Sequence, residues 1–287
     1  MKHHLTRLDH PVIAVRDMEA ARAVYERLGF IVPPRGRHPE WGTGNWCIQF
    51  AENYLELRGF FQPSDAPQTR ELLTFLERRE GLMGIAFGTT GAQRSYESLS
   101  AAGLHPRPVK PLTRDFELPE GTIPVSFQLC FLPREETPAL MHVVVCEHLT
   151  PELLRRPEWL RHANGARRVA GLVAVAHDPH AAIRAWSLLF EDITPVAGGV
   201  RARVGDGWLL LLDPGSVRRR YASVALPPAS EWPCLVSIVM DVERLQETRA
   251  LFRARGITCE DCDGDGVVVA PADACGTLLE FRSCPEP

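Results

Sequence analysis

The residues of this chain that could do chemistry are histidines and carboxylates in or beside strand-like segments. His10 lies in the apolar run that begins the chain, Glu56 lies in the segment LEL, and three more candidates follow one another closely, namely His142, Glu147 and His148. A neutral imidazole and a carboxylate suit Zn, Fe, Mn, Co or Ni, and a metal with open positions can accept two substrate oxygens. Such a site requires a fold that brings these segments together.

The elements that must position these side chains repeat along the chain in the order strand, helix and further strands. The first copy starts with LDHPVIAV. It continues in an amphipathic helix that Asp17 is expected to cap and Gly29 to end. Two strands around a turn at Glu52 and Asn53 complete this copy.

Three further copies follow the same order. The second has Gly103 at the end of its helix and finishes near His148, the third contains a GDG hairpin turn, and the fourth finishes with LLEF. Asp178 and Asp241 each follow an apolar strand and are expected to open a helix, as in the first copy. The pattern predicts an α+β fold of four βαβββ modules.

Two connecting segments are both expected to be helical. The first, PSDAPQTRELLTFLERREG, links copies one and two and carries an apolar stripe of Leu72, Leu73, Phe75 and Leu76. The second, HLTPELLRRPEWLRHANGARR, links the two halves and carries the capping residues Thr150, Pro151, Asn164 and Gly165. We place a domain boundary near residue 165, with an N-terminal domain over 1–165 and a C-terminal domain over 166–287.

Composition indicates an ordinary globular protein. The chain has 287 residues, 45% hydrophobic and 24% charged, with a net charge of -4. The charge gives no general attraction to nucleic acid or anionic lipid. No signal peptide and no membrane-length apolar run is visible, so we expect a cytoplasmic protein. The eight cysteines are scattered among strand-like segments, which predicts free thiols.

Two other metal-like patterns are weaker. Cys259 and Cys262 form a CxxC, but no second pair stands at zinc-ribbon spacing. The segment DCDGDG resembles the start of a calcium loop, yet Ala272 stands where the bidentate Glu would be. A tight hairpin turn explains this segment better.

The chain resembles the glyoxalase-like domain proteins of the vicinal oxygen chelate superfamily. The resemblance rests on LDHPVIAVRDMEAARAVYERLGF, on GRHPEWGTGNWCIQFAENYLELRG and on CEHLTPELLRRPEWLRHANGA. It implies paired modules that curl into two incomplete barrels, each with a cup that could hold a metal or a small molecule.

The resemblance also implies a metal site in the N-terminal cup. In enzymes of the superfamily, side chains from the first and last strands of paired modules hold the metal, and His10 and Glu56 stand at such positions. Gly84 stands where a histidine of the second module would be. We therefore take His148 as the third ligand and Glu147 as its reserve, since strand alternation prevents both from facing the cup.

His38, in the loop GRHPEWGTGN, is a candidate acid, base or substrate contact beside Glu56, which could also move protons. The alternatives remain open. His10 and Glu56 could satisfy neighbouring groups in a barrel that binds nothing, His148 could hydrogen-bond the start of the next helix, and His38 could lie on a surface loop.

The second half offers fewer ligands. Glu280 matches Glu56 in the repeat, but Gly171 and Cys234 stand in the places of His10, and Leu210 falls in an apolar final strand. We expect this half to support the first one, to form an apolar pocket, or to provide an oligomer surface such as that of a homodimer.

Two hypotheses follow. The first is a metal-dependent lyase, isomerase or dioxygenase that acts on a small molecule with vicinal oxygens, with the site in the N-terminal cup. The second is a non-catalytic protein of the bleomycin-resistance type that binds or sequesters a small molecule in the same cup. Metal bound to the purified protein would favour the first hypothesis.

Overall fold

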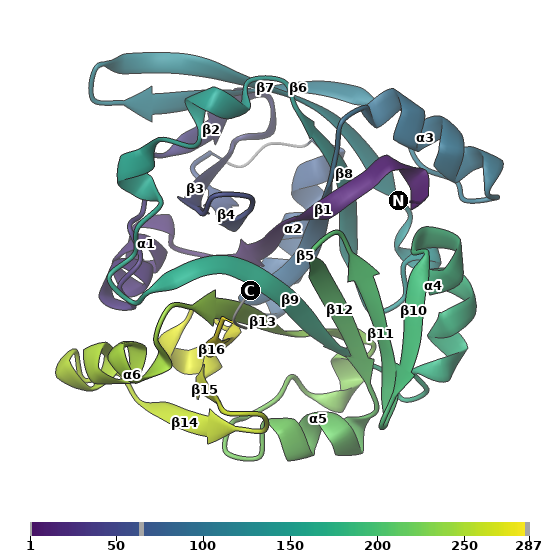
Figure 1. Cartoon of the computed structure of the whole chain (residues 1–287). Coiled ribbons are helices and arrows are strands. Elements are labelled where there is room, and N and C mark those ends of the chain that lie inside the picture. Colours follow the sequence, from purple (N-terminus) through teal and green to yellow (C-terminus); the bar gives the residue numbers. More distant parts are fainter. Residues whose placement is uncertain (1, 63–65, 285–287) are drawn as a thin grey trace.

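The computed structural model describes residues 2–62 and 66–284, and it arranges their strands in two sheets (Figure 1). Each sheet has eight strands and is built from two successive modules. The α+β fold of four βαβββ modules is therefore confirmed. Within the described ranges, no helix combines the length and the apolar character that a membrane crossing requires.

The first two modules form the N-terminal sheet. Module one consists of β1 (Leu5–Ala14), α1 (Met18–Arg27), β2 (Gly36–His38), β3 (Thr43–Gln49) and β4 (Tyr54–Phe60). After α2 (Pro67–Arg78), module two consists of β5 (Gly81–Thr89), α3 (Ala92–Ala101), β6 (Lys110–Leu118), β7 (Gly121–Leu132) and β8 (His142–His148).

The last two modules form the C-terminal sheet. Module three consists of β9 (Ala166–Val175), α4 (Ile183–Leu189), β10 (Asp192–Val196), β11 (Gly199–Val204) and β12 (Gly207–Leu212). After α5 (Pro214–Arg220), module four consists of β13 (Cys234–Val242), α6 (Leu245–Ala254), β14 (Cys259–Cys262), β15 (Gly266–Val269) and β16 (Leu278–Ser283).

The two sheets differ in how far they close. The N-terminal strands follow the order β1-β4-β3-β2-β6-β7-β8-β5, and β5 pairs with β1 again, so this barrel is closed. The short β2–β6 pairing, Gly36 with Phe116 and Arg37 with Asp115, provides the closure that the expected incomplete barrel would lack. The C-terminal sheet runs from β10 to β14 and stays open.

Local chemistry explains both ends of α1. The Asp17 carboxylate accepts a hydrogen bond from the backbone N–H of Ala20 at 2.9 Å and so caps α1. Gly29 follows this helix with φ +90°, a conformation that favours glycine. In α2, Leu72, Phe75 and Leu76 are buried, as expected for the inner face of an amphipathic helix, whereas Leu73 is exposed.

Asp241 does not open a helix, contrary to the prediction. It lies inside β13, fully buried, and its two oxygens accept hydrogen bonds from Arg168 and Arg282. The helix α6 begins four residues later, after Arg244. An aspartate at the end of an apolar run has the same local pattern whether it caps a helix or receives two arginines from neighbouring strands.

The connection between the halves is also not an α-helix. It forms only two short 3₁₀ turns, Pro151–Leu153 and Pro157–Trp159. Pro157 has no N–H for a helical hydrogen bond and disfavours helix in the residue before it, which interrupts the predicted helix. The Thr150 hydroxyl accepts a bond from the Ser126 N–H instead of capping a helix.

Side-chain amides join the two halves. Asn53, in the β3–β4 turn, bonds both the N–H and the C=O of Val169 on β9. The Asn164 side-chain amide donates to the carbonyl of Leu28, and the backbone carbonyl of Asn164 accepts from the Thr248 hydroxyl of α6. One hydrophobic core runs through both sheets, and the domain boundary near residue 165 stays a prediction.

His162 belongs to the same joint. Its Nδ1 accepts from the backbone N–H of Ile31 at 3.0 Å, and its Nε2 donates to the carbonyl of Gln49 at 2.9 Å. This pattern requires a neutral ring. Burial lowers the pKa of His162 from 6.5 to about 4.

We expect His162 to weaken the fold in acid. Between its unfolded pKa of 6.5 and its folded pKa of about 4 the unfolded chain binds the extra proton, so stability falls as the pH falls through this range. In His162→Gln, the loss of stability between about pH 7 and about pH 4.5 should shrink by on the order of 2 kcal/mol. Urea denaturation at both pH values measures this, and an unchanged loss in the variant would contradict it.

Candidate functional site in the N-terminal barrel

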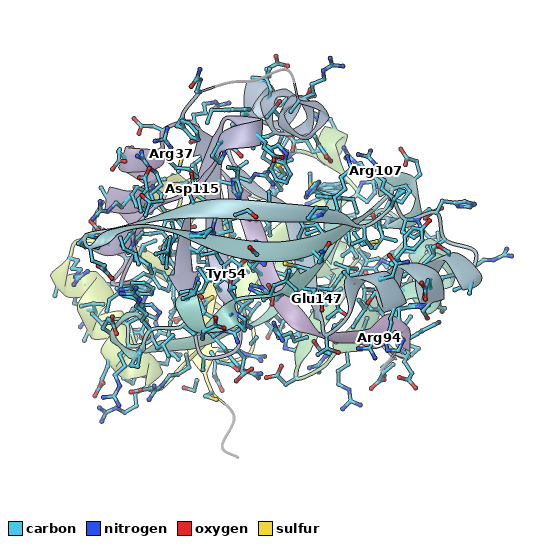
Figure 2. All side chains as sticks on the ribbon, turned by 90° about the horizontal axis from the view of Figure 1, so that it is seen from above. Arg37, Tyr54, Arg94, Arg107, Asp115 and Glu147 are labelled. Carbon is cyan, nitrogen blue, oxygen red and sulfur yellow. The ribbon has the colours of Figure 1, made fainter. Side chains whose placement is uncertain are left out.

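The N-terminal barrel encloses a small cavity, which we call the cup, of about 50 Å³. Figure 2 looks down on the barrel from the side of the long β6–β7 hairpin. A space of this size holds a few water molecules or a ligand of a few atoms. The cup is lined by His10, Val12, His38, Trp41, Asn45, Tyr54, Glu56, Arg58, Leu112, Arg114, Phe127, Leu129, Phe131, His142, Val144 and Cys146.

The structure brings His10 and Glu56 together. They come from the neighbouring strands β1 and β4, both are 6% exposed, and His10 Nε2 lies 3.5 Å from Glu56 Oε2. The ring of Tyr54 stacks on the imidazole of His10 with centroids 4.2 Å apart, and its hydroxyl lies 3.4 Å from His10 Nε2. The sequence prediction that these two residues share a cup is consistent with this geometry.

Asp9 fixes the orientation of His10. The register of β1 against β5 shifts between Leu8 and His10, and such an irregularity can re-aim side chains at a functional site. The Asp9 carboxylate accepts a hydrogen bond from His10 Nδ1 at 2.8 Å. The proton is therefore on Nδ1, and Nε2 points to Glu56 as the ring atom available for a ligand.

Asp9 is the centre of a wider buried network. It is fully buried and also accepts hydrogen bonds from Arg7 Nε at 2.9 Å and from His148 Nε2 at 2.9 Å. Burial alone would raise its pKa, but the charges and hydrogen bonds of His148 and His10 hold the pKa of Asp9 well below its usual value. An ionised Asp9 therefore ties β1 to β8.

Glu56 is held as a carboxylate. Its Oε1 accepts a hydrogen bond from Asn45 Nδ2 at 2.6 Å. Burial raises its pKa, but His10 and Arg58 outweigh this effect and bring the pKa of Glu56 to about 2. An ionised carboxylate at every physiological pH is a good ligand and a weak base.

His38 lies in the same cup, at the end of β2. Its Nδ1 is 3.1 Å from the Thr43 hydroxyl, and its ring stacks on Trp41. Burial, followed by the charge of Arg58, lowers the pKa of His38 to about 3. The ring is neutral near pH 7 and suits a hydrogen-bond contact better than a proton-transfer role.

His148 takes a different place from the one expected. It does not contact Glu56 but bonds Asp9, which stands behind His10. Glu147 points the other way, as strand alternation requires, and its carboxylate accepts a hydrogen bond from the Ala92 N–H at the start of α3. The third ligand predicted from the sequence is thus placed behind the His10–Glu56 pair.

Strand pairing locates the other two ligand positions of the repeat. The pairing of Val12 with Glu56 in module one corresponds to that of Ala86 with Val144 in module two. The counterparts of His10 and Glu56 are then Gly84 and Val144, neither of which can bind a metal through its side chain. A Cβ at Gly84 would come within 2.3 Å of the His142 carbonyl.

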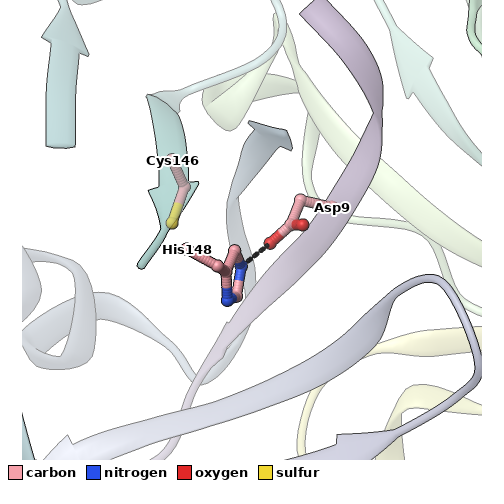
Figure 3. Close-up of side chains that lie close together, drawn as sticks. All are labelled: Asp9, Cys146 and His148. Atoms are coloured by element: carbon pink, nitrogen blue, oxygen red, sulfur yellow. Dashed lines mark hydrogen bonds and ion pairs between the residues drawn. The ribbon is translucent and has the colours of Figure 1, made fainter. Parts of the chain in front are cut away.

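A second group of metal-type side chains adjoins the cup. Single ligand atoms of Asp9, Cys146 and His148 lie within 4.8 Å of one another (Figure 3). The Asp9 oxygens already accept hydrogen bonds from Arg7, His10 and His148. Burial raises the pKa of the Cys146 thiol well above its usual value. The group is thus better described as a hydrogen-bonded support for His10 than as a cation site.

In the second half, the positions that correspond to His10 and Glu56 are occupied by residues with other contacts. Both oxygens of Glu280 bond Arg220, and one of them also accepts from the Tyr221 hydroxyl. The ring of Trp208 packs directly over Gly171, where a Cβ would come within 2.3 Å of it. Val239 of β13 pairs with Glu280 of β16, as Val12 pairs with Glu56 in module one. The residue that corresponds to His10 is therefore Ser237, two residues before Val239, and not Cys234 as the sequence suggested.

Several site residues were missed by sequence reasoning. The sequence could have indicated Asp9, because it is adjacent to His10. It could also have indicated Arg58, because a residue two positions after Glu56 lies on the same face of a strand. Arg114 and Asn45 had none, because only the barrel brings β3 and β6 to this cup. All eight cysteines are free thiols, as predicted.

A family model for a glyoxalase-like domain matches residues 8–190, more than half of the chain. The chain belongs to the glyoxalase-like domain family. This confirms the resemblance predicted from the sequence. No curated protein matches the chain.

Solved structures share the fold of this glyoxalase-like protein. A hypothetical protein from Staphylococcus aureus has a TM-score of 0.70 at 11% identity, covering 96% of this chain and 99% of that chain. A mutant of 4-hydroxymandelate synthase from Streptomyces coelicolor has a TM-score of 0.57 at 10% identity, covering 96% and 92%. A xylose isomerase-like TIM barrel/4-hydroxyphenylpyruvate dioxygenase fusion protein has 0.57 at 13%, covering 98% of this chain and 49% of that one. At these low sequence identities, the three matches establish the fold and nothing about the activity.

The role assigned to Asp9 predicts the behaviour of Asp9→Asn. The amide keeps the shape but removes the charge that two imidazoles and a guanidinium face, so unfolding should cost about 3 kcal/mol less than in the wild type. The ¹⁵N spectrum of the histidine rings should show His10 losing its fixed Nδ1–H form. A variant with wild-type stability and an unchanged His10 ring would contradict the assignment.

Proposed function

We propose that the cup is the functional site and that His10 and Glu56 hold a divalent metal there, for a reaction on a small molecule with adjacent oxygen atoms. One observation carries this proposal. An imidazole nitrogen left open by the Asp9 hydrogen bond and an ionised carboxylate converge at 3.5 Å from two strands inside a closed barrel. These are ligand types that suit Zn, Fe, Mn, Co or Ni.

The donor set fits a metal that keeps most of its positions for water and substrate. His10 and Glu56 would supply two protein ligands, while Gly84 and Val144 supply none. His148 would have to give up its bond to Asp9 to serve as the third ligand. When bound, such a metal would act as a Lewis acid toward adjacent substrate oxygens, as a lyase, isomerase or dioxygenase of this kind requires.

The residues around His10 and Glu56 hold these two proposed ligands in position and offer a contact for the substrate. Asp9 keeps the His10 ring in one orientation, and Asn45 holds Glu56 through Oε1 while Oε2 faces His10. His38, as a neutral ring, can donate or accept one hydrogen bond to a substrate. The closed barrel limits water to a small cavity, which strengthens every polar contact inside it.

A small-molecule binding protein without catalysis is the second candidate. It is favoured by Arg58 and Arg114, two buried guanidinium groups that line the cup and add positive charge beside the two ligands. In this case the cup would hold its ligand by hydrogen bonds and charge alone. A cytoplasmic location and a homodimer remain predictions under both candidates.

Metal retention separates the two candidates. Purified protein should carry a divalent metal, and His10→Ala or Glu56→Ala should lower the affinity for added Co²⁺ by about 100-fold, because each removes one of two protein ligands. Elemental analysis by mass spectrometry and a Co²⁺ titration measure this.

The matched control is His105→Ala. His105 and Glu136 form an imidazole–carboxylate pair outside the cup, with His105 81% exposed, so this variant should keep the wild-type metal content. Protein that holds no metal, and binds none on addition, would overturn the metal-dependent proposal in favour of the binding protein.

A further inference from the structure

Among the described residues, the cup is lined by two buried guanidinium groups but by only one carboxylate, that of Glu56. Arg58, on β4, is 9% exposed and Arg114, on β6, is 2% exposed. Over residues 2–62 and 66–284, neither forms an ion pair, and the Nε–H group of each lacks a hydrogen-bond partner. Burying a charged group without a partner is costly, and buried polar atoms of this kind are rare in folded proteins.

The groups around the cup leave this charge uncompensated. Glu56 is the carboxylate in the lining, and it balances one of the two guanidinium groups. His38 contributes no charge near pH 7. Asp9 stands behind His10 and is already engaged by Arg7 and two imidazoles. The lining therefore carries one positive charge in excess.

The arginines are fixed in place rather than loosely accommodated. Arg114 Nη1 donates to Asn45 Oδ1 at 2.9 Å and lies 2.9 Å from Cys47 Sγ. Gly36 leaves space for this arrangement, since a Cβ there would come within 2.5 Å of Arg114 Cδ. The guanidinium of Arg58 lies over the ring of Trp41 at 5.4 Å. Aromatic faces hold guanidinium groups while leaving their N–H edges free to donate.

We propose that the cup binds a small carboxylate and that Arg58 and Arg114 receive its carboxylate group. The planar fork of N–H donors on a guanidinium matches the two oxygens of a carboxylate. A cavity of about 50 Å³ restricts the ligand to a few heavy atoms. Resting on the function proposed above, the oxygen on the carbon next to the carboxylate would face His10 and Glu56.

The test uses the whole protein freed of metal by a chelator, so that anion binding is measured apart from metal binding. Glycolate, its neutral amide glycolamide and inorganic phosphate are titrated by calorimetry. Glycolate should bind at least tenfold more tightly than glycolamide, which has the same size without the charge, and more tightly than phosphate. Equal binding of glycolate and glycolamide, or no binding of either, overturns the proposal. Tighter binding of phosphate overturns the choice of a carboxylate.

Variants locate the anion. Arg58→Met and Arg114→Met should each weaken glycolate binding at least tenfold, and Arg58→Lys, which keeps the charge without the fork, should weaken it as well. Arg37→Met is the matched control, because Arg37 also stacks on an aromatic ring, Phe61, but pairs with Glu117 and does not line the cup. Wild-type affinity in both cup variants overturns the proposal.

Stability gives a second readout. Because the two guanidinium groups share one carboxylate, removing one of them should leave Arg58→Met at least as stable as the wild type in urea while it loses the anion. A purely structural arginine would give a less stable variant. Glycolate binding without metal retention supports this inference and removes only the metal proposal. Metal retention without glycolate binding overturns this inference and leaves the metal proposal in place.

Discussion

The N-terminal barrel depends on one buried carboxylate, that of Asp9. It is ionised in a fully buried position, which is tolerated only because Arg7, His10 and His148 all donate to it. These contacts tie β1 to β8 and turn His10 Nε2 toward Glu56. The network that stabilises the barrel therefore also orients the proposed ligand atom, so changes to Asp9 should affect the fold and the proposed site together.

The two halves share the same order of strands and helices, but the side chains at corresponding positions differ. In the first half the barrel closes over charged side chains, and two buried arginines share one carboxylate, without an ion pair among the described residues. In the second half Glu280 is neutralised by Arg220, and Trp208 fills the space over Gly171. The second sheet shares its hydrophobic core with the first and is tied to it through Asn53 and Asn164. We infer that it mainly supports the half that carries the site.

Much of the fold could be predicted from the sequence, because strand and helix periodicity repeats four times and glycines mark the helix ends. The prediction for Asp241 was wrong because a local pattern does not reveal its distant partners Arg168 and Arg282. The helix predicted over 151–159 was wrong because Pro157, inside the segment, interrupts it. At the site, the family resemblance pointed to His10 and Glu56, because they stand on the first and last strands of module one. Arg114 could not be found, since the residues that its guanidinium hydrogen-bonds, Asn45 and Cys47, lie on β3, far from it in the sequence.

The central claim is that the cup, with His10 and Glu56 at one side and two arginines in its lining, is where this protein meets its ligand. A crystal structure of the protein with Mn²⁺ and glycolate, using anomalous data, tests it most directly. We expect an anomalous peak in contact with His10 Nε2 and Glu56, and a carboxylate against Arg58 and Arg114. A cup that holds only water, with the metal bound at the protein surface, would contradict the account.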